Sequence, residues 1–222
     1  MFIFLSYKID SNTPIYGGKT SFLSNKETSI KNGDSANTQK WNMQNHLGTH
    51  IDFPYHFYEN GQTSDFFPPE FWIINSEKIQ VLEFNLIEKK YLIEPENFVK
   101  DEFNSDAQFL ILKTGFGKYR SQEKFWKYNP GISVETTDWI IKNFKKIKII
   151  GIDSISISSW QHREIGRKVH KKLLNPKNPI LIIEDMDLTK INRDTIFKRV
   201  IIAPLIVSKS DGGPCTILAE VK

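Results

Sequence analysis

The chain has 222 residues, a formal net charge of +4 and a single cysteine. This length suits one domain with a sizeable core, or at most two small ones. Its lysines lie in short groups, such as positions 142–148 and 168–172, which is typical of solvated faces rather than of a nucleic-acid-binding surface. No apolar run approaches the roughly 20 residues needed to span a bilayer, and the short apolar N-terminus lacks the basic lead of a signal peptide. We therefore expect a soluble protein with no nucleic-acid or membrane partner.

The lone cysteine, Cys215, excludes an intramolecular disulfide and fits a reducing cytoplasm. It begins a predicted strand and has no histidine near it in the sequence. We interpret it as a packed small residue rather than a nucleophile.

The N-terminal part of the chain predicts a strand, a turn-rich stretch and a polar segment. Residues 2–6 are apolar and predict a short strand. Residues 10–18 are rich in turn formers, including Pro14 and a Gly-Gly pair, and contain Tyr16. Residues 24–38 are polar with a turn at 32–34, which predicts either a hairpin or a flap over the functional site.

The densest group of metal-capable side chains lies in residues 46–57, which hold three of the five histidines. Strand alternation gives His46, His50, Asp52 and His56 the same parity. In a straight strand His46 and His50 would be about 13 Å apart, too far to share one ion bound at about 2 Å. The chain must therefore bend between them, and Gly48 is the residue that permits a bulge or kink. His50 and Asp52 can then reach one ion, with His56 close enough to act as a base.

The rest of the chain alternates predicted strands with few helices. Phe66 and Phe67, followed by two prolines, form a rigid aromatic segment that either packs a loop or lines a hydrophobic substrate pocket. Residues 95–99 predict a short strand or a turn. Strands are predicted at 71–75, 78–84, 107–113, 148–152, 180–183, 196–203 and 216–221, and helices at 136–144 and 163–174. This alternation favours one α/β domain.

Two further polar residues lie in apolar surroundings. His170 lies beside the apolar stripe of the predicted helix at 163–174, where a lone histidine is usually a satisfied core residue. Glu184 follows a buried strand, and a carboxylate there is costly unless it is paired or bound to a metal.

The order His-x-Gly-Thr-His-x-Asp-x-Pro-x-His, from His46 to His56, resembles the motif of the cyclase family, which contains bacterial kynurenine formamidase and isatin hydrolase. Further similarity runs almost end to end, in residues 5–9, 13–18, 112–116, 151–153, 169–174, 183–185 and 211–214. The resemblance implies one domain over residues 1–222. Its fold would be α/β, with a β-rich barrel-like core and outer helices of the swivelling β/β/α type.

The resemblance also implies a metal-dependent hydrolase that opens or cleaves a small aryl amide, lactam or lactone with an activated water. The implied cofactor is Zn²⁺ or Mn²⁺, as one or two ions, and we expect a homo-oligomer, either dimer or tetramer. The implied metal ligands are His46, His50, Asp52, His170 and Glu184, with His56 as the general acid/base. Tyr16, Phe66 and Phe67 are our candidate substrate-binding residues.

Several alternatives stay open on the sequence alone. Tyr16 is the best match to a tryptophan that lines the substrate site of the formamidases, which puts formamide specificity in doubt. His162 competes with His170 as the distal ligand, or contacts a substrate carboxylate together with Arg163, or simply caps a surface helix. Isatin hydrolase-like ring opening, a ring-closing reaction and a non-catalytic metal-binding protein are the alternative functions.

Overall fold

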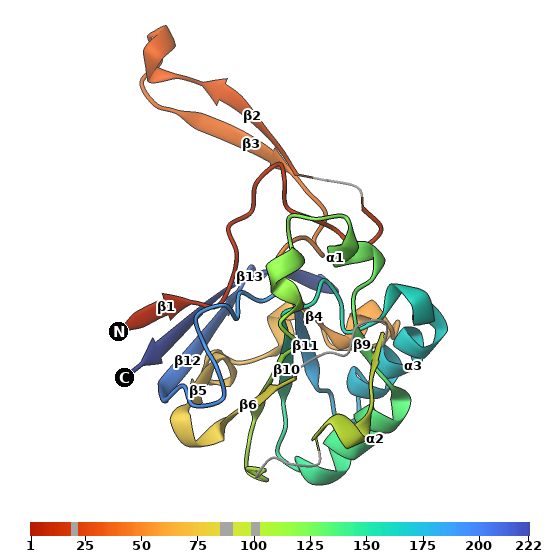
Figure 1. The fold of residues 1–222 in the computed structure, drawn as a ribbon. Helices are drawn as coiled ribbons and strands as arrows, with labels where there is room; N and C mark the ends of the chain where they lie inside the picture. Colours follow the sequence, from red (N-terminus) through yellow and green to blue (C-terminus); the bar gives the residue numbers. More distant parts are fainter. Residues whose placement is uncertain (19–21, 85–90, 99–102) are drawn as a thin grey trace.

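The computed structural model describes residues 1–18, 22–84, 91–98 and 103–222. Nine strands form the main sheet, in the order β5-β12-β13-β4-β11-β10-β8-β6, with β1 paired to β13. The sheet is strongly bent into a nearly closed, barrel-like core, with few helices outside it, as the resemblance implied (Figure 1). The strands are β1 (Phe2–Phe4), β4 (His50–Asp52), β5 (Ile73–Asn75), β6 (Ile79–Glu83), β8 (Phe109–Lys113), β10 (Ile149–Ile152), β11 (Leu181–Glu184), β12 (Phe197–Pro204) and β13 (Gly212–Val221).

The parallel half of the sheet carries the most apolar strands. Strands β6, β8, β10 and β11 run parallel, and every residue of β10 and β11 is buried. Parallel strands covered on both faces read as continuous apolar runs, which is why these segments were predictable from the sequence.

Strand β4 is short but central, because it pairs antiparallel with β11 on one side and with β13 on the other. This register places His50 opposite Glu184, and Asp52 opposite Gly212. Three segments that are far apart in the sequence therefore meet at β4.

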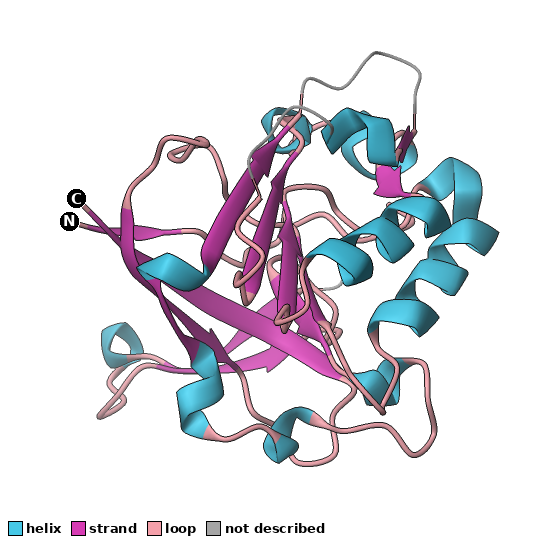
Figure 2. Cartoon of the chain, turned by 90° about the horizontal axis from the view of Figure 1, so that it is seen from below, coloured by secondary structure: helices cyan, strands magenta, loops and turns pink. Residues whose placement is uncertain are grey.

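The two longer helices lie together outside the sheet (Figure 2). Helix α2 (Val134–Asn143) begins at Ser133, whose side chain accepts a hydrogen bond from the backbone of Thr136. Helix α3 (Arg163–Leu173) buries Val169, His170 and Leu173. The shorter elements are α1 (Lys124–Lys127), the pair β7 (Leu92–Ile93) and β9 (Gly131–Ile132), and 3₁₀ turns at Ile30–Asn32, Pro54–His56, Ser64–Phe66, Pro69–Trp72, Ser76–Lys78, Pro95–Phe98, Phe116–Tyr119 and Trp160–His162.

Strands β2 (Leu23–Thr28) and β3 (Thr38–Asn42) form a hairpin that projects from the body of the molecule (Figure 1). Apart from Thr28, every residue of the two strands is exposed. The hairpin expected for residues 24–38 is confirmed. It projects away from the body (Figure 1) and does not form the flap that was the alternative expectation.

Three predicted elements differ clearly from the structure. Strand β13 begins at Gly212, four residues before the predicted start at residue 216. The strand expected at 71–75 starts later, because Pro68 and Pro69 lead into a 3₁₀ turn that ends at Trp72. The segment at 95–99 forms a 3₁₀ turn over Pro95–Phe98, and Val99 lies outside the described residues. In the described part of the chain, no helix is long and apolar enough to cross a bilayer.

Candidate metal centre

The chain bends at Gly48, as the spacing of the histidines predicted. Gly48 has a φ of +63°, a left-handed conformation that glycine adopts without strain. The bend brings the ring centroids of His46 and His50 to 5.2 Å, instead of the separation that a straight strand would give. His46 precedes β4 and His50 begins it, so both imidazoles reach the same end of the sheet.

Two histidines and two carboxylates converge beside β4. Nε2 of His50 lies 3.5 Å from Oδ1 of Asp52 and 3.5 Å from Oε2 of Glu184. Nε2 of His170 lies 3.5 Å from Oδ2 of Asp52 and 3.4 Å from Oε1 of Glu184. All four side chains are buried. Buried ionisable groups of this kind need each other or a bound ion to offset the loss of hydration.

The outer nitrogens of both histidines are held by backbone carbonyl oxygens. Nδ1 of His50 donates to the carbonyl of Gly48 at 2.8 Å, and Nδ1 of His170 donates to that of Gly166 at 2.9 Å. A carbonyl can only accept, so each Nδ1 carries a hydrogen, and Nε2 is the nitrogen that faces the carboxylates and could bind a metal ion in place of a proton. Two ligand atoms about 2.1 Å from one tetrahedral ion lie about 3.4 Å apart. The observed separations therefore fit a divalent ion held by His50, Asp52 and Glu184, with His170 facing the other oxygen of each carboxylate.

Serine and backbone groups of residues 156–158 hold the side chains of Glu184 and His170 in place. The carboxylate of Glu184 accepts from the hydroxyl of Ser156 at 2.9 Å and from the backbone N–H of Ile157 at 2.8 Å. The hydroxyl of Ser158 lies 3.2 Å from Nδ1 of His170. Such outer partners orient metal ligands and fix their protonation.

The electrostatics of the centre favour a cation. Burial lowers the pKa of His170, but the adjacent carboxylates of Asp52 and Glu184 outweigh it and raise the pKa to about 10. Burial raises the pKa of Asp52, and the neighbouring histidines, led by His170 and His46, outweigh it and hold the pKa well below its usual range. Positive charge is stabilised here, whether a proton or a metal ion carries it.

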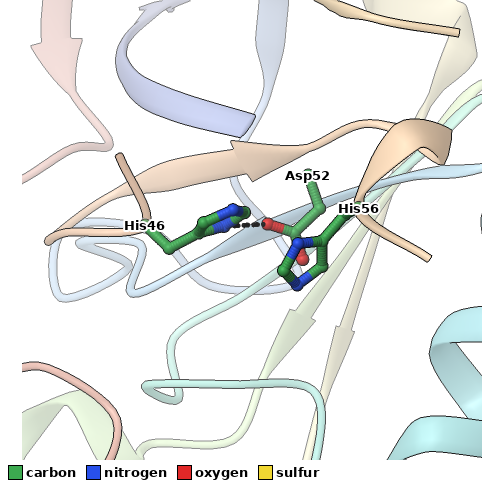
Figure 3. Close-up of side chains that lie close together, drawn as sticks. All are labelled: His46, Asp52 and His56. Carbon is green, nitrogen blue, oxygen red and sulfur yellow. Dashed lines mark hydrogen bonds and ion pairs between the residues drawn. The ribbon is translucent and has the colours of Figure 1, made fainter. Parts of the chain in front are cut away.

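A second group of side chains shares Asp52. Nδ1 of His46 lies 2.8 Å from Oδ1 of Asp52, and the two side chains lie beside His56 (Figure 3). Donor atoms of His46, Asp52 and His56 lie within 4.8 Å of one another, as do those of His50, Asp52 and Glu184. Asp52 can therefore serve two adjacent positions.

Asp211 links the two outer histidines and had no predicted role. Its Oδ2 lies 2.9 Å from Nε2 of His46 and 2.8 Å from Nδ1 of His56. Hydrogen bonds from both imidazoles hold the pKa of Asp211 far below its usual range. The similarity of residues 211–214 to the family was the available signal, but the contact itself depends on the pairing of β4 with β13.

A cavity of about 270 Å³ opens onto these groups. Besides the histidines and carboxylates, its wall includes Tyr16, Phe57, Arg163 and Arg167. The ring of Phe57 stacks on that of His170 with centroids 4.9 Å apart. The cavity therefore combines an apolar wall with two cationic side chains, which suits a small molecule.

Of the three predicted substrate-binding residues, only Tyr16 lines the cavity. Tyr16 lines the cavity and packs edge-on against Trp160 at 5.0 Å. Phe66 and Phe67 do not line it: Phe66 is 65% exposed, and Phe67 stacks on Phe53 at 5.6 Å within an aromatic cluster. The observed contacts of Phe66 and Phe67 therefore agree with the interpretation that this segment packs a loop, and neither ring lines the cavity.

Of the two competing histidines, His170 reaches the centre. His162 is exposed, is absent from the cavity wall and lies in the 3₁₀ turn before α3. Arg163, which was considered with it as a carboxylate contact, does line the cavity.

Residues 3–159 match the family model named Cyclase. The chain belongs to the Cyclase family. Among curated proteins, this family member is 26% identical to the kynurenine formamidase of Bacillus cereus over 210 residues, which cover 95% of this chain and 92% of the relative. It is also 30% identical over 145 residues to an uncharacterized protein of Methanocaldococcus jannaschii, covering 65% of this chain and 62% of that protein.

Solved structures share the fold of this Cyclase family member. Isatin hydrolase A from Labrenzia aggregata superposes with a TM-score of 0.79 at 17% identity, covering 99% of this chain and 93% of that one. A structure described as a metal-dependent hydrolase from Bacillus stearothermophilus gives a TM-score of 0.75 at 19% identity, with coverages of 99% and 97%. The barrel-like α/β architecture is therefore shared along nearly the whole chain.

Proposed function

We propose that this protein is a metal-dependent hydrolase that cleaves a carbon–nitrogen bond in a small aryl amide or lactam, with a lactone as the corresponding ester substrate. The observation that carries the proposal is the convergence of two imidazole nitrogens and two carboxylates at 3.4–3.5 Å. The names of the relatives, kynurenine formamidase and isatin hydrolase, support the same class of reaction.

His50, Asp52, His170 and Glu184 would hold the ion, and His46 would join Asp52 at a second, adjacent position. Imidazole and carboxylate ligands suit Zn²⁺ or Mn²⁺, and the shared Asp52 favours two ions over one. A divalent ion bound here supplies a Lewis acid for the carbonyl and lowers the pKa of a water molecule.

His56 is proposed as the general acid/base. Its Nδ1 is bonded to Asp211, so Nε2 is the nitrogen left to exchange a proton with a substrate in the cavity. It takes a proton from the attacking water and returns it to the leaving nitrogen. Asp211 fixes the ring and stabilises the imidazolium while the proton resides there, as the carboxylate does in other histidine-dependent hydrolases.

The substrate is proposed to be small and partly aromatic. Tyr16 and Phe57 give the cavity apolar walls, and about 270 Å³ excludes a macromolecule from the interior. Because Tyr16 is the best match to the tryptophan of the formamidases, we expect N-formylkynurenine to be cleaved weakly or not at all. Ring opening of an isatin-like lactam is the second candidate, supported by the shared fold.

We also propose that residues 1–222 form one domain that assembles as a homo-oligomer in the cytoplasm. One apolar cluster contains residues from β4 to β13 and from both longer helices, which supports a single domain. The exposed hairpin β2–β3 carries Leu23, Ile30 and Trp41 on its surface, which a second copy could cover. Replacing residues 24–41 with a two-residue turn should convert the oligomer to a monomer while preserving the melting temperature of the body; an unchanged mass by light scattering would refute the role of the hairpin.

The proposed function is tested by metal analysis and a substrate screen. We expect at least one equivalent of Zn²⁺ or Mn²⁺ per chain and metal-dependent hydrolysis of an aryl amide, lactam or lactone that a chelator abolishes. A protein that retains metal but hydrolyses none of N-formylkynurenine, isatin, formanilides and simple lactones would instead be a non-catalytic metal-binding protein. A kcat/KM on the order of 10⁵ M⁻¹s⁻¹ for N-formylkynurenine would overturn the argument from Tyr16.

A further inference from the structure

We propose that the substrate carries a carboxylate across an aromatic ring from its scissile bond, and that Arg163 and Arg167 bind this group at the mouth of the cavity. The inference rests on the proposed function for the identity of the site. It narrows the substrate class from aryl amides and lactams in general to acidic ones.

One face of α3 supplies both arginines and an inner histidine. Arg163, Arg167 and His170 follow one another at spacings of four and three residues, so they share a helix face. All three line the same cavity. At 1.5 Å per residue, Arg167 lies about 4.5 Å and Arg163 about 10.5 Å along the helix axis from His170. The aromatic ring of the proposed substrate would span that interval, with its amide toward His170 and its carboxylate toward the arginines.

Both guanidinium groups are available to a ligand. Arg163 lies over the ring of Trp160 at 4.9 Å and forms no ion pair with any described residue. Arg167 is paired with Glu164, an exposed carboxylate three residues away on the same helix. Exposed pairs of this kind contribute little energy, so a bound carboxylate can replace Glu164.

Tyr16 lines the same cavity as the two arginines. Burial raises the pKa of Tyr16 to about 12, and the positive charges of Arg163 and Arg167 oppose that shift. Trp160 contacts Tyr16 at 5.0 Å and Arg163 at 4.9 Å, which places Arg163 next to the wall that Tyr16 forms. The aromatic edge of Tyr16 and the planar guanidinium forks together suit an aryl carboxylate, because arginine binds carboxylates with two parallel hydrogen bonds.

The net charge of the site also favours an anionic substrate. The two proposed divalent ions carry four positive charges against the three carboxylates of Asp52, Glu184 and Asp211. Arg163 and Arg167 together with Glu164 add one more positive charge, so the cavity keeps an excess of positive charge. An anionic substrate reduces this excess, and a neutral one does not.

The test is the binding of two probes that differ only in charge, 4-acetamidobenzoate and 4-acetamidobenzamide, measured by calorimetry on the purified metal-containing protein. We expect the carboxylate to bind at least about tenfold more tightly than the amide. Arg163→Gln and Arg167→Gln should each weaken carboxylate binding about five- to tenfold while leaving amide binding within twofold. Arg163→Lys should retain part of the preference. Lys168→Gln, which removes the same charge from an exposed position of α3 that does not line the cavity, should change neither affinity.

Three results would overturn the proposal: equal binding of the two probes, no binding of the carboxylate at 10 mM, or a preference for the carboxylate that survives both arginine substitutions. The last result would assign the carboxylate to the metal. Hydrolysis of the corresponding formanilides separates this proposal from the proposed function. Arginine-dependent binding without turnover would contradict only the hydrolase, and equal turnover of the charged and neutral formanilides without arginine-dependent binding would contradict only the carboxylate site.

Discussion

At the scale of single residues, Asp211 is the contact that most affects the proposed chemistry. It accepts hydrogen bonds from His46 and His56, and its carboxylate stays ionised because both imidazoles lower its pKa. Asp211→Asn removes that charge and leaves the ring nitrogens of His56 without a fixed proton arrangement. At saturating metal we expect kcat to fall about 10- to 100-fold with little change in KM, as for other groups that orient catalytic or ligating histidines. Wild-type kcat in the variant would show that His56 does not depend on Asp211.

At the scale of elements, the packing of α3 on Ser158 supports the proposed metal ligands. A Cβ added at Gly166 would lie 2.0 Å from Oγ and 2.4 Å from Cβ of Ser158. Gly166→Ala must therefore push this segment away, and with it the Ser156 and Ile157 groups that hold Glu184. Alanine is the better helix former by about 1 kcal/mol, but overpacking costs about 1–3 kcal/mol, so the clash should win.

We expect Gly166→Ala to lower both the melting temperature and the metal content. Ser158→Gly in the same chain should restore part of each loss, because it removes the two nearest atoms. Lys168→Ala, on the exposed face of α3, is the matched control and should be neutral. An unchanged or higher melting temperature with full metal content would mean that the segment yields without affecting Glu184.

The elements also show which parts of the site were predictable. Buried parallel strands and the apolar stripe of α3 leave direct patterns in the sequence, and the bend at Gly48 followed from the reach of a metal ion. The role of Asp211 could not be read in this way, because it depends on β4 lying between β11 and β13, a pairing with no local signal. The sequence left the role of Phe66 and Phe67 open for a related reason: a short aromatic run is compatible both with a pocket and with the cluster around Phe53.

At the scale of the whole molecule, the concentration of charge at the centre links stability to pH once the metal is removed. Burial lowers the pKa values of His46 and His170, but the adjacent carboxylates raise both to about 10, above the value of about 6.5 in the unfolded chain. The protonated imidazoles therefore stabilise the metal-free fold fully below about pH 6.5, and this contribution is lost as the pH rises toward 10. The lowered pKa values of Asp52 and Asp211 act at the other end, where stability is lost as the pH falls below about 4.

We expect the urea midpoint of the chelated protein to fall steadily between pH 7 and pH 10. The metal-loaded protein is the control over the same range, because its ligand nitrogens carry no proton to lose and the titration of surface lysines is common to both forms. Parallel curves for the two forms would contradict the proposed link between these histidines and the metal.

The central claim is that His50 binds the metal while His56 exchanges protons. Its most direct test measures metal content and turnover side by side in His50→Ala and His56→Ala. His50 contributes Nε2 to the inner cluster, whereas His56 lies at its edge and is bonded to Asp211. We predict that His50→Ala loses most of its metal and its activity together. His56→Ala should keep wild-type metal content and lose turnover by about a hundredfold or more. Equal metal content in His50→Ala and the wild type, or metal loss in His56→Ala as severe as that expected for His50→Ala, would contradict the account.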